Sequence, residues 1–173
     1  ELLLDQVSAA LHYPVAKLAP EKREILQNLH DSDGVLEGRK VLIVDDDIRN
    51  IYSLASVLEA HGAEVLHAER GAEGIAILEQ NPDIDVALID IMMPEMDGYE
   101  TMQRIRANPY LAHIPLLSVT AKAMKGDRQK CLDAGASDYI SKPVDIDLLL
   151  ALLRVWIGRS RARADMLKAA NAA

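Results

Sequence analysis

From position 39 onward, short apolar runs alternate with segments in which apolar residues recur at helical spacing. Most of the short runs are apolar without interruption, which predicts strands that are buried on both faces of a sheet. The predicted strands are 41–44, 64–68, 86–89, 115–119 and 139–140. The predicted helices are 51–58, 72–80, 99–107, 125–134 and 146–157. This alternation favours an α/β fold, in which helices cover both faces of a parallel sheet.

Charged and hydroxyl side chains follow four of the five predicted strands. They are Asp45, Asp46 and Asp47 after the first strand, Asp90 after the third, Thr120 after the fourth and Lys142 after the fifth. Right-handed crossovers place the carboxyl ends of parallel strands along one edge of the sheet, and ligands bind at that edge. We therefore expect these side chains to converge.

Converging carboxylates repel one another, so at neutral pH such a cluster requires either protons or a cation. Oxygen ligands of this kind suit Mg²⁺. An aspartate carboxylate is also a nucleophile towards phosphoryl groups, with which it forms an aspartyl-phosphate. The hydroxyl of Thr120 and the ammonium of Lys142 are suited to stabilise the negative charge of a phosphoryl group. Together, these residues predict a phosphoryl-accepting site that uses Mg²⁺.

Each of these residues, taken singly, also has a structural interpretation. Asp45, Asp46 and Asp47 precede a predicted helix and are suited to capping it, and we expect Asp47 to have this role. An aspartate at a strand end often belongs to a turn, and a single lysine is usually a solvated surface residue. The coincidence of all these side chains on strand ends favours the phosphoryl-accepting site.

Four segments resemble the receiver domain of two-component response regulators. They are VLIVDDD (41–47), VALIDIMMPEMDGYE (86–100), LLSVTAKA (116–123) and GASDYISKPV (135–144). The resemblance covers residues 39–158 and implies a flavodoxin-like, doubly wound sheet of five parallel strands in the order 2-1-3-4-5, with five helices. It also implies that the peptide bond between Lys142 and Pro143 is cis, a geometry that is accessible mainly before proline.

The same resemblance implies a role for each matching position. Asp90 is the implied phosphoacceptor. The implied Mg²⁺ ligands are Asp45, Asp46, Asp90 and the backbone carbonyl of Met92. The groups implied around the phosphoryl oxygens are Thr120 and Lys142, and Tyr139 is the implied switch aromatic. The resemblance implies that the receiver promotes phosphoryl transfer to its own Asp90.

The sequences of the motifs are most similar to those of receivers in hybrid sensor histidine kinases, so we expect the parent protein to be a histidine kinase. Residues 1–38 are then a helical N-terminal linker or the end of a preceding module, 39–158 the receiver domain and 159–173 a basic C-terminal tail. One alternative is a stand-alone or transcriptional response regulator. More distant alternatives are a haloacid-dehalogenase-type phosphatase, whose first motif Asp45-x-Asp47 resembles, and a binding module with a vestigial pocket.

The composition of the chain limits the classes of partner and the cellular location that we expect. A net charge of −8 argues against nucleic-acid binding by this domain. The single cysteine, Cys131, and the lack of a signal-peptide pattern or a long apolar run favour a reducing, cytoplasmic location. The expected partners are the phosphohistidine domain of a histidine kinase and a histidine phosphotransfer protein.

The helix predicted over 146–157 has more apolar residues than one buried face requires. We expect one stripe to cover the sheet, namely Leu148, Leu149, Leu152, Val155 and Trp156. An adjoining stripe consists of Leu150, Leu153 and Ile157. Because soluble proteins rarely expose a large apolar patch, this second stripe predicts self-association or docking of the N-terminal segment through the 146–157 helix.

Overall fold

The computed structural model describes residues 34–121 and 126–171. The helices expected within 1–38 fall before residue 34 and therefore lie outside the described residues. Within the described part of the chain, no helix is long and apolar enough to cross a membrane.

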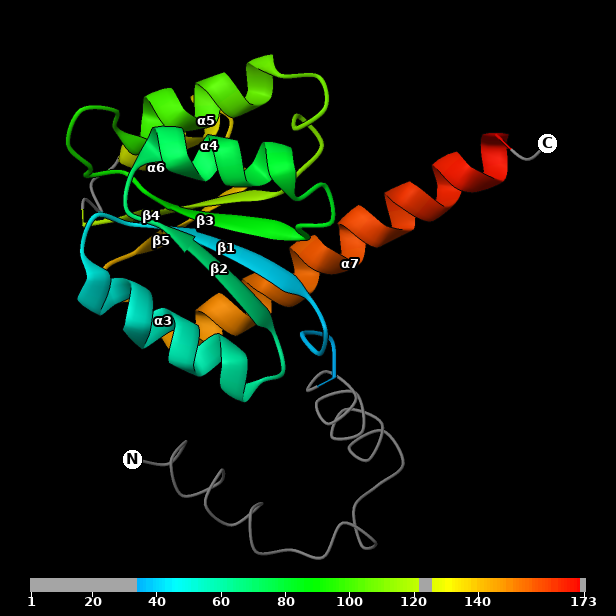
Figure 1. The fold of residues 1–173 in the computed structure, drawn as a ribbon, viewed down its shortest axis with the longest axis horizontal. Helices are drawn as coiled ribbons and strands as arrows, with labels where there is room; N and C mark the ends of the chain where they lie inside the picture. Colours follow the sequence, from blue (N-terminus) through cyan, green and yellow to red (C-terminus); the bar gives the residue numbers. More distant parts are fainter. Residues whose placement is uncertain (1–33, 122–125, 172–173) are drawn as a thin grey trace, which may run out of the picture. The chain divides into compact units, whose positions relative to one another are not determined.

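Five parallel strands form one sheet in the order β2-β1-β3-β4-β5 (Figure 1). The strands are β1 (Lys40–Val44), β2 (Glu64–Ala68), β3 (Val86–Asp90), β4 (Leu116–Thr120) and β5 (Asp138–Ser141). The helices are α3 (Ile48–Ala60), α4 (Gly71–Gln80), α5 (Gly98–Ala107), α6 (Asp127–Asp133) and α7 (Ile146–Asn171). The predicted doubly wound α/β fold with strand order 2-1-3-4-5 is confirmed.

The sheet separates two apolar layers (Figure 1). One layer lies under α3 and α7, and the other lies under α4, α5 and α6. Every residue of β3 and of β4 is buried, as their uninterrupted apolar runs predict. Leu58 and Leu153 belong to the first layer, whereas Leu78 and Met102 belong to the second. The central strands are therefore fixed from both sides, whereas the edge strand β2 is partly exposed.

Helix α7 does not end at Ile157 as expected but continues to Asn171. The segment that we assigned to a basic C-terminal tail, 159–173, is thus helical through Asn171. Gly158 disfavours a helix by about 1 kcal/mol relative to alanine. The residues after it are mainly alanine, arginine, leucine and lysine, which favour a helix, and none is proline. One glycine is therefore insufficient to end the helix.

The prediction of which residues of α7 face the core is correct for Leu149 and wrong for Leu148 and Val155. The buried residues are those that we assigned to the partner-facing stripe, Leu150, Leu153 and Ile157, together with Leu149. Leu148 and Val155, which we assigned to the sheet, are each 47% exposed, whereas Leu152 and Trp156 pack partly against the core. The stripe that includes Ile146 and reaches Ile157 is longer, so turning it inward removes more apolar surface from water.

The two faces of α7 give a stability test. Leu153→Ala should lower the free energy of unfolding by about 2–5 kcal/mol, because it leaves a cavity in the layer beneath α3 and α7. Leu148→Ala removes the same atoms from a half-exposed position and should cost less than about 1 kcal/mol. Urea denaturation of both variants measures the difference. Equal losses would contradict the observed orientation of the helix.

Candidate functional site

The strand order brings together acidic residues that are far apart in the sequence. Strands β1 and β3 are neighbours, and Val44 pairs with Ile89 in their register. Asp45 and Asp90 follow these two residues and are therefore adjacent, with exposed fractions of only 2% and 3%. Asp46 is exposed beside them, and the three carboxylates each offer an oxygen within 4.8 Å of the others. The predicted convergence of these residues is present.

Lys142 joins this acidic cluster from the end of β5. Its Nζ donates one hydrogen bond of 2.9 Å to Asp45 Oδ2 and another of 2.9 Å to Asp90 Oδ2. The Lys142–Pro143 peptide bond is cis, as expected. One ammonium against the three carboxylates leaves an excess of two negative charges at the site.

Burial and charge act in opposite directions on the ionisable groups. Burial raises the pKa of Asp90 above its ordinary value of 3.8, and the Lys142 ammonium offsets only part of this effect. For Lys142, burial lowers the pKa, but hydrogen bonds to Asp45 and Asp90 outweigh it, so the net shift is upward. The lysine therefore remains a positive charge at neutral pH.

Asn50 is a site residue that the sequence reasoning missed. Its side-chain amide donates to both carboxylate oxygens of Asp45, at 3.1 and 3.2 Å. The Asp47 backbone N–H donates to Asp45 Oδ1 at 2.9 Å. With Lys142, these donors fix the orientation of the Asp45 carboxylate. The one signal in the sequence is an amide side chain in the first turn of the helix that follows the aspartates.

Asp47 caps α3, as predicted. Its side chain accepts a hydrogen bond from the Arg49 backbone N–H at 3.0 Å, and the Arg49 guanidinium also donates to it at 2.6 and 2.9 Å. These hydrogen bonds lower the pKa of Asp47 to about 2. Asp47 is thus occupied at the helix terminus, and the remaining carboxylates form the cluster.

The other predicted residues lie around the cluster. Thr120 is fully buried at the carboxyl end of β4. The Met92 backbone N–H donates to Asp90 Oδ1 at 3.3 Å, and the Met92 side chain is 54% exposed. Tyr139 is half-buried on β5 against the layer under α4, α5 and α6, with the Arg128 guanidinium 5.9 Å from its ring centroid. Lys142 is therefore in direct contact with two of the carboxylates, whereas Tyr139 lies against the layer under α4, α5 and α6.

Gly98 explains how the chain after β3 folds back tightly over the site. A Cβ at this position would clash with the backbone carbonyl of Asp90 and would lie 2.7 Å from the Cα of Ile91. The Gly98 N–H donates to the Ile91 carbonyl at 3.0 Å. Only glycine permits this approach, so Gly98 helps to define the backbone that carries Asp90.

The cluster fits a small divalent cation. Mg²⁺ binds oxygen ligands at about 2.1 Å, so its ligands lie up to about 4.2 Å apart, and the three carboxylates approach this spacing. The uncompensated negative charge and the oxygen-only donors suit the same ion. Asp45, Asp46 and Asp90 are the residues that would hold it.

The fold and the site together define a class: a doubly wound α/β protein with an acidic cluster and a lysine at the strand ends. Comparison with known families makes this specific. The response regulator receiver domain family matches residues 41–154. The chain belongs to this family and is a receiver domain of two-component signalling.

Curated relatives include both free-standing receivers and kinases. The chain is 39% identical over 111 residues to protein PilH of Pseudomonas aeruginosa, in a match that covers 64% of the chain and 91% of PilH. It is 35% identical over 145 residues to histidine kinase 3 of Arabidopsis thaliana. That match covers 72% of the chain but only 13% of the kinase, so the chain corresponds to a small part of that protein.

Solved structures show the same fold. The receiver domain of a sensor histidine kinase from Pseudomonas aeruginosa, with a magnesium ion in its active-site cleft, is 33% identical with a TM-score of 0.65. The match covers 70% of this chain and 98% of that one. A receiver from Saccharomyces cerevisiae, in complex with a histidine phosphotransfer protein, is 26% identical with a TM-score of 0.64. That match covers 70% of this chain and 90% of the other.

The raised pKa of Asp90 predicts how the stability of the domain depends on pH when divalent cations are absent. Because the folded state binds the Asp90 proton more tightly than the unfolded chain, its contribution to stability falls as the pH rises above 3.8. Asp90→Asn removes this loss of stability and keeps a side-chain oxygen that can accept the hydrogen bond from Lys142. The variant should therefore gain stability relative to the wild type between pH 4 and pH 7, measured by thermal denaturation in EDTA.

Asp83→Asn is the matched control, with the opposite sign. A hydrogen bond from Lys40, whose Nζ lies 2.7 Å away, lowers the pKa of Asp83, so the ionised carboxylate stabilises the folded state above pH 3.8 and loses this effect in acid. Asp83→Asn should lose stability relative to the wild type over the same pH range. If both variants gained stability, or both lost it, relative to the wild type as the pH rises, the assigned pKa shifts of Asp90 and Asp83 would be contradicted.

Proposed function

We propose that this chain is a phosphorylatable receiver that accepts a phosphoryl group from a phosphohistidine onto Asp90. The observation that carries the proposal is the contact of Lys142 with both Asp45 and Asp90 within a cluster of three carboxylates. A vestigial pocket has no need of a lysine held against two buried acids. Membership of the receiver family decides against the phosphatase alternative.

In the proposed reaction, a carboxylate oxygen of Asp90 attacks the phosphorus atom of the phosphohistidine. The P–N bond breaks, and its electron pair returns to the imidazole nitrogen. Asp45, Asp46, Asp90 and the Met92 carbonyl would hold Mg²⁺, which would compensate the negative charge that gathers at the site. The Asn50 amide keeps the Asp45 carboxylate in place during this change.

Lys142 and Thr120 act on the product of the transfer. The Lys142 ammonium already touches Asp90 Oδ2, so it is placed to pair with an oxygen of the phosphoryl group attached there. The Thr120 hydroxyl, at the end of the adjacent strand β4, donates a hydrogen bond to another oxygen. Movement of Thr120 towards the phosphoryl group leaves space into which Tyr139 turns, which couples phosphorylation to the β5 side of the domain.

The proposed setting is the cytoplasmic part of a hybrid histidine kinase. Residues 1–38 would be a linker or the end of a preceding module, and 159–173 a basic C-terminal segment. Similarity to kinase receivers and to a receiver bound to a histidine phosphotransfer protein supports a phosphorelay in which this chain donates to such a protein. The match to nearly all of PilH favours the alternative, a stand-alone regulator. The two settings can be distinguished by testing the transfer of radiolabelled phosphate from this chain to the phosphotransfer proteins of its own organism. If none of these proteins accepts the phosphate, the result opposes the relay.

Phosphorylation of Asp90 can be tested directly with acetyl phosphate. Intact-mass spectrometry should detect one phosphoryl group on the wild type in the presence of Mg²⁺. The adduct should be absent in Asp90→Asn and strongly reduced in EDTA. Asp97→Asn, which alters only the cap of α5, should still be phosphorylated. An adduct that persists in Asp90→Asn would refute the assignment.

Beryllofluoride, which mimics the attached phosphoryl group, tests Thr120 and Lys142. Thr120→Val and Lys142→Gln should remain folded but bind beryllofluoride about 10- to 100-fold more weakly, because each loses a hydrogen bond to a charged group. Titrations followed by NMR amide shifts measure this affinity. The control Lys130→Gln changes an exposed lysine on α6 and should bind as the wild type does. Wild-type affinity in both site variants would rule out the proposed roles.

A further inference from the structure

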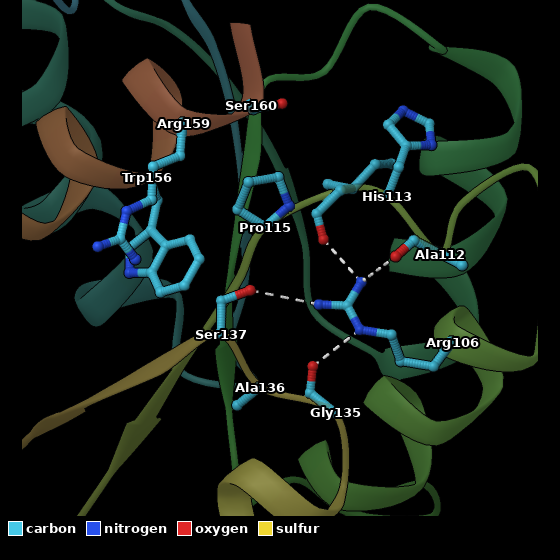
Figure 2. Close-up of a pocket in the computed structure, with 11 residues that line it drawn as sticks. Arg106, Ala112, His113, Pro115, Gly135, Ala136, Ser137, Trp156, Arg159 and Ser160 are labelled. Atoms are coloured by element: carbon cyan, nitrogen blue, oxygen red, sulfur yellow. Dashed lines mark hydrogen bonds between the residues drawn. The ribbon is translucent and has the colours of Figure 1, made fainter. Parts of the chain in front are cut away.

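A cavity lies at the opposite edge of the sheet from the acidic cluster. Its volume is about 360 Å³, and it borders the amino-terminal ends of β4 and β5, where Pro115 and Ser137 precede the two strands (Figure 2). Arg106 of α5 forms one side, and Trp156, Arg159 and Ser160 of α7 form the other. The carboxyl ends of the same strands carry the phosphoryl-accepting site, so the two sites are separate.

The lining of this cavity has a sign of charge opposite to that of the whole chain. Among the described residues, it includes two arginines and His113, but no aspartate or glutamate. The chain as a whole has 27 acidic against 19 basic residues. A concave site with cationic groups and no carboxylate attracts anions.

Arg106 is held at the cavity by neutral groups only. Its Nε donates to the Gly135 carbonyl at 2.8 Å, and its Nη1 donates to the carbonyls of Ile114 and Ala112 at 2.7 and 3.0 Å. Its Nη2 makes a longer contact of 3.4 Å with Ser137 Oγ (Figure 2). Burial lowers the pKa of Arg106, and no ion pair opposes this effect. The cavity therefore contains a fixed, half-buried positive charge without an anionic partner among the described residues, and Nη2 is its least engaged donor.

Trp156 and Arg159 supply an aromatic ring and a second cationic group. The Arg159 guanidinium lies 5.0 Å from the indole ring centroid and is exposed. The indole Nε1–H of Trp156 is buried and has no acceptor in the described part of the chain. This N–H is covered by protein atoms, so Trp156 lines the cavity with its ring rather than with a donor. Pro115 and the indole ring add apolar surface beside the two guanidinium groups.

We propose that this cavity binds a small organic anion, a carboxylate or phosphate group attached to an apolar ring. The anionic group lies between Arg106 Nη2 and the Arg159 guanidinium, which leaves its stacked position to reach it. The ring lies against Pro115 and the indole of Trp156. The volume of about 360 Å³ is within the range of small-molecule sites.

Trp156 is the single tryptophan of the chain and lines the cavity, so its fluorescence reports binding there. The full chain is titrated in EDTA with benzoate, phenyl phosphate, inorganic phosphate and the neutral analogue benzyl alcohol. We expect saturable fluorescence changes with benzoate, phenyl phosphate or both, weaker binding of inorganic phosphate and none of benzyl alcohol. The comparison of benzoate with phenyl phosphate identifies the preferred anionic group.

Arg159→Gln should weaken binding of the preferred probe about 10- to 100-fold, because it removes a charged hydrogen-bond donor. Arg104→Gln, an exposed arginine of α5 that pairs with Glu100, is the matched control and should bind as the wild type does. Arg106 is not a suitable variant, since its hydrogen bonds also hold two loops. Isothermal titration calorimetry gives the affinities independently of the fluorophore.

Two results would overturn the proposal: no saturable binding of either ring-bearing anion, or equal affinity in the wild type and Arg159→Gln. The outcome is independent of the proposed phosphoryl transfer. Arg159→Gln should still accept a phosphoryl group on Asp90, and Asp90→Asn should still bind the anion.

Discussion

The mutual repulsion of buried carboxylates is the constraint around which this domain is organised. Asp45 and Asp90 lie side by side because β1 and β3 are neighbours, and burial makes their negative charge costly. Lys142 offsets part of this cost from the end of β5, across the sheet. The remaining negative charge suits a small divalent cation, on which the proposed phosphoryl transfer would depend. Without a bound cation, the carboxylate cluster thus keeps a net negative charge that a cation would balance.

Much of this arrangement was predictable because it depends on local patterns. Uninterrupted apolar runs identify β3 and β4, and the polar residues after four of the strands identify the edge that carries the candidate site. Features that depend on three-dimensional packing were not predictable. The spacing of leucines in α7 shows a wide apolar arc but not which part faces the sheet, so Leu148 and Leu153 were assigned to the wrong sides. Gly158 indicates a helix end only when its neighbours disfavour a helix.

Single polar residues were the hardest to interpret from the sequence. Asn50 and Arg106 belong to no motif, and each resembles an ordinary surface residue of a helix. Their roles come from contacts with distant segments: Asn50 binds the carboxylate of Asp45, and Arg106 binds carbonyls that precede β4 and β5. The two residues also mark opposite edges of one sheet. The domain thus has a negatively charged cluster at the carboxyl ends of the strands and a positively charged cavity at their amino ends.

The division of the interior by the sheet has a consequence for how such a sequence can change over time. Among the residues that the structure describes, the layer under α3 and α7 and the layer under α4, α5 and α6 share no buried side chain. A volume lost at Leu58 can be refilled only by neighbours such as Ile51 or Leu153, and a change at Met102 only by its own layer. Compensating substitutions are therefore confined to one side of the sheet. Each side of the domain can acquire new surfaces while the strand ends, and the site that they carry, stay the same.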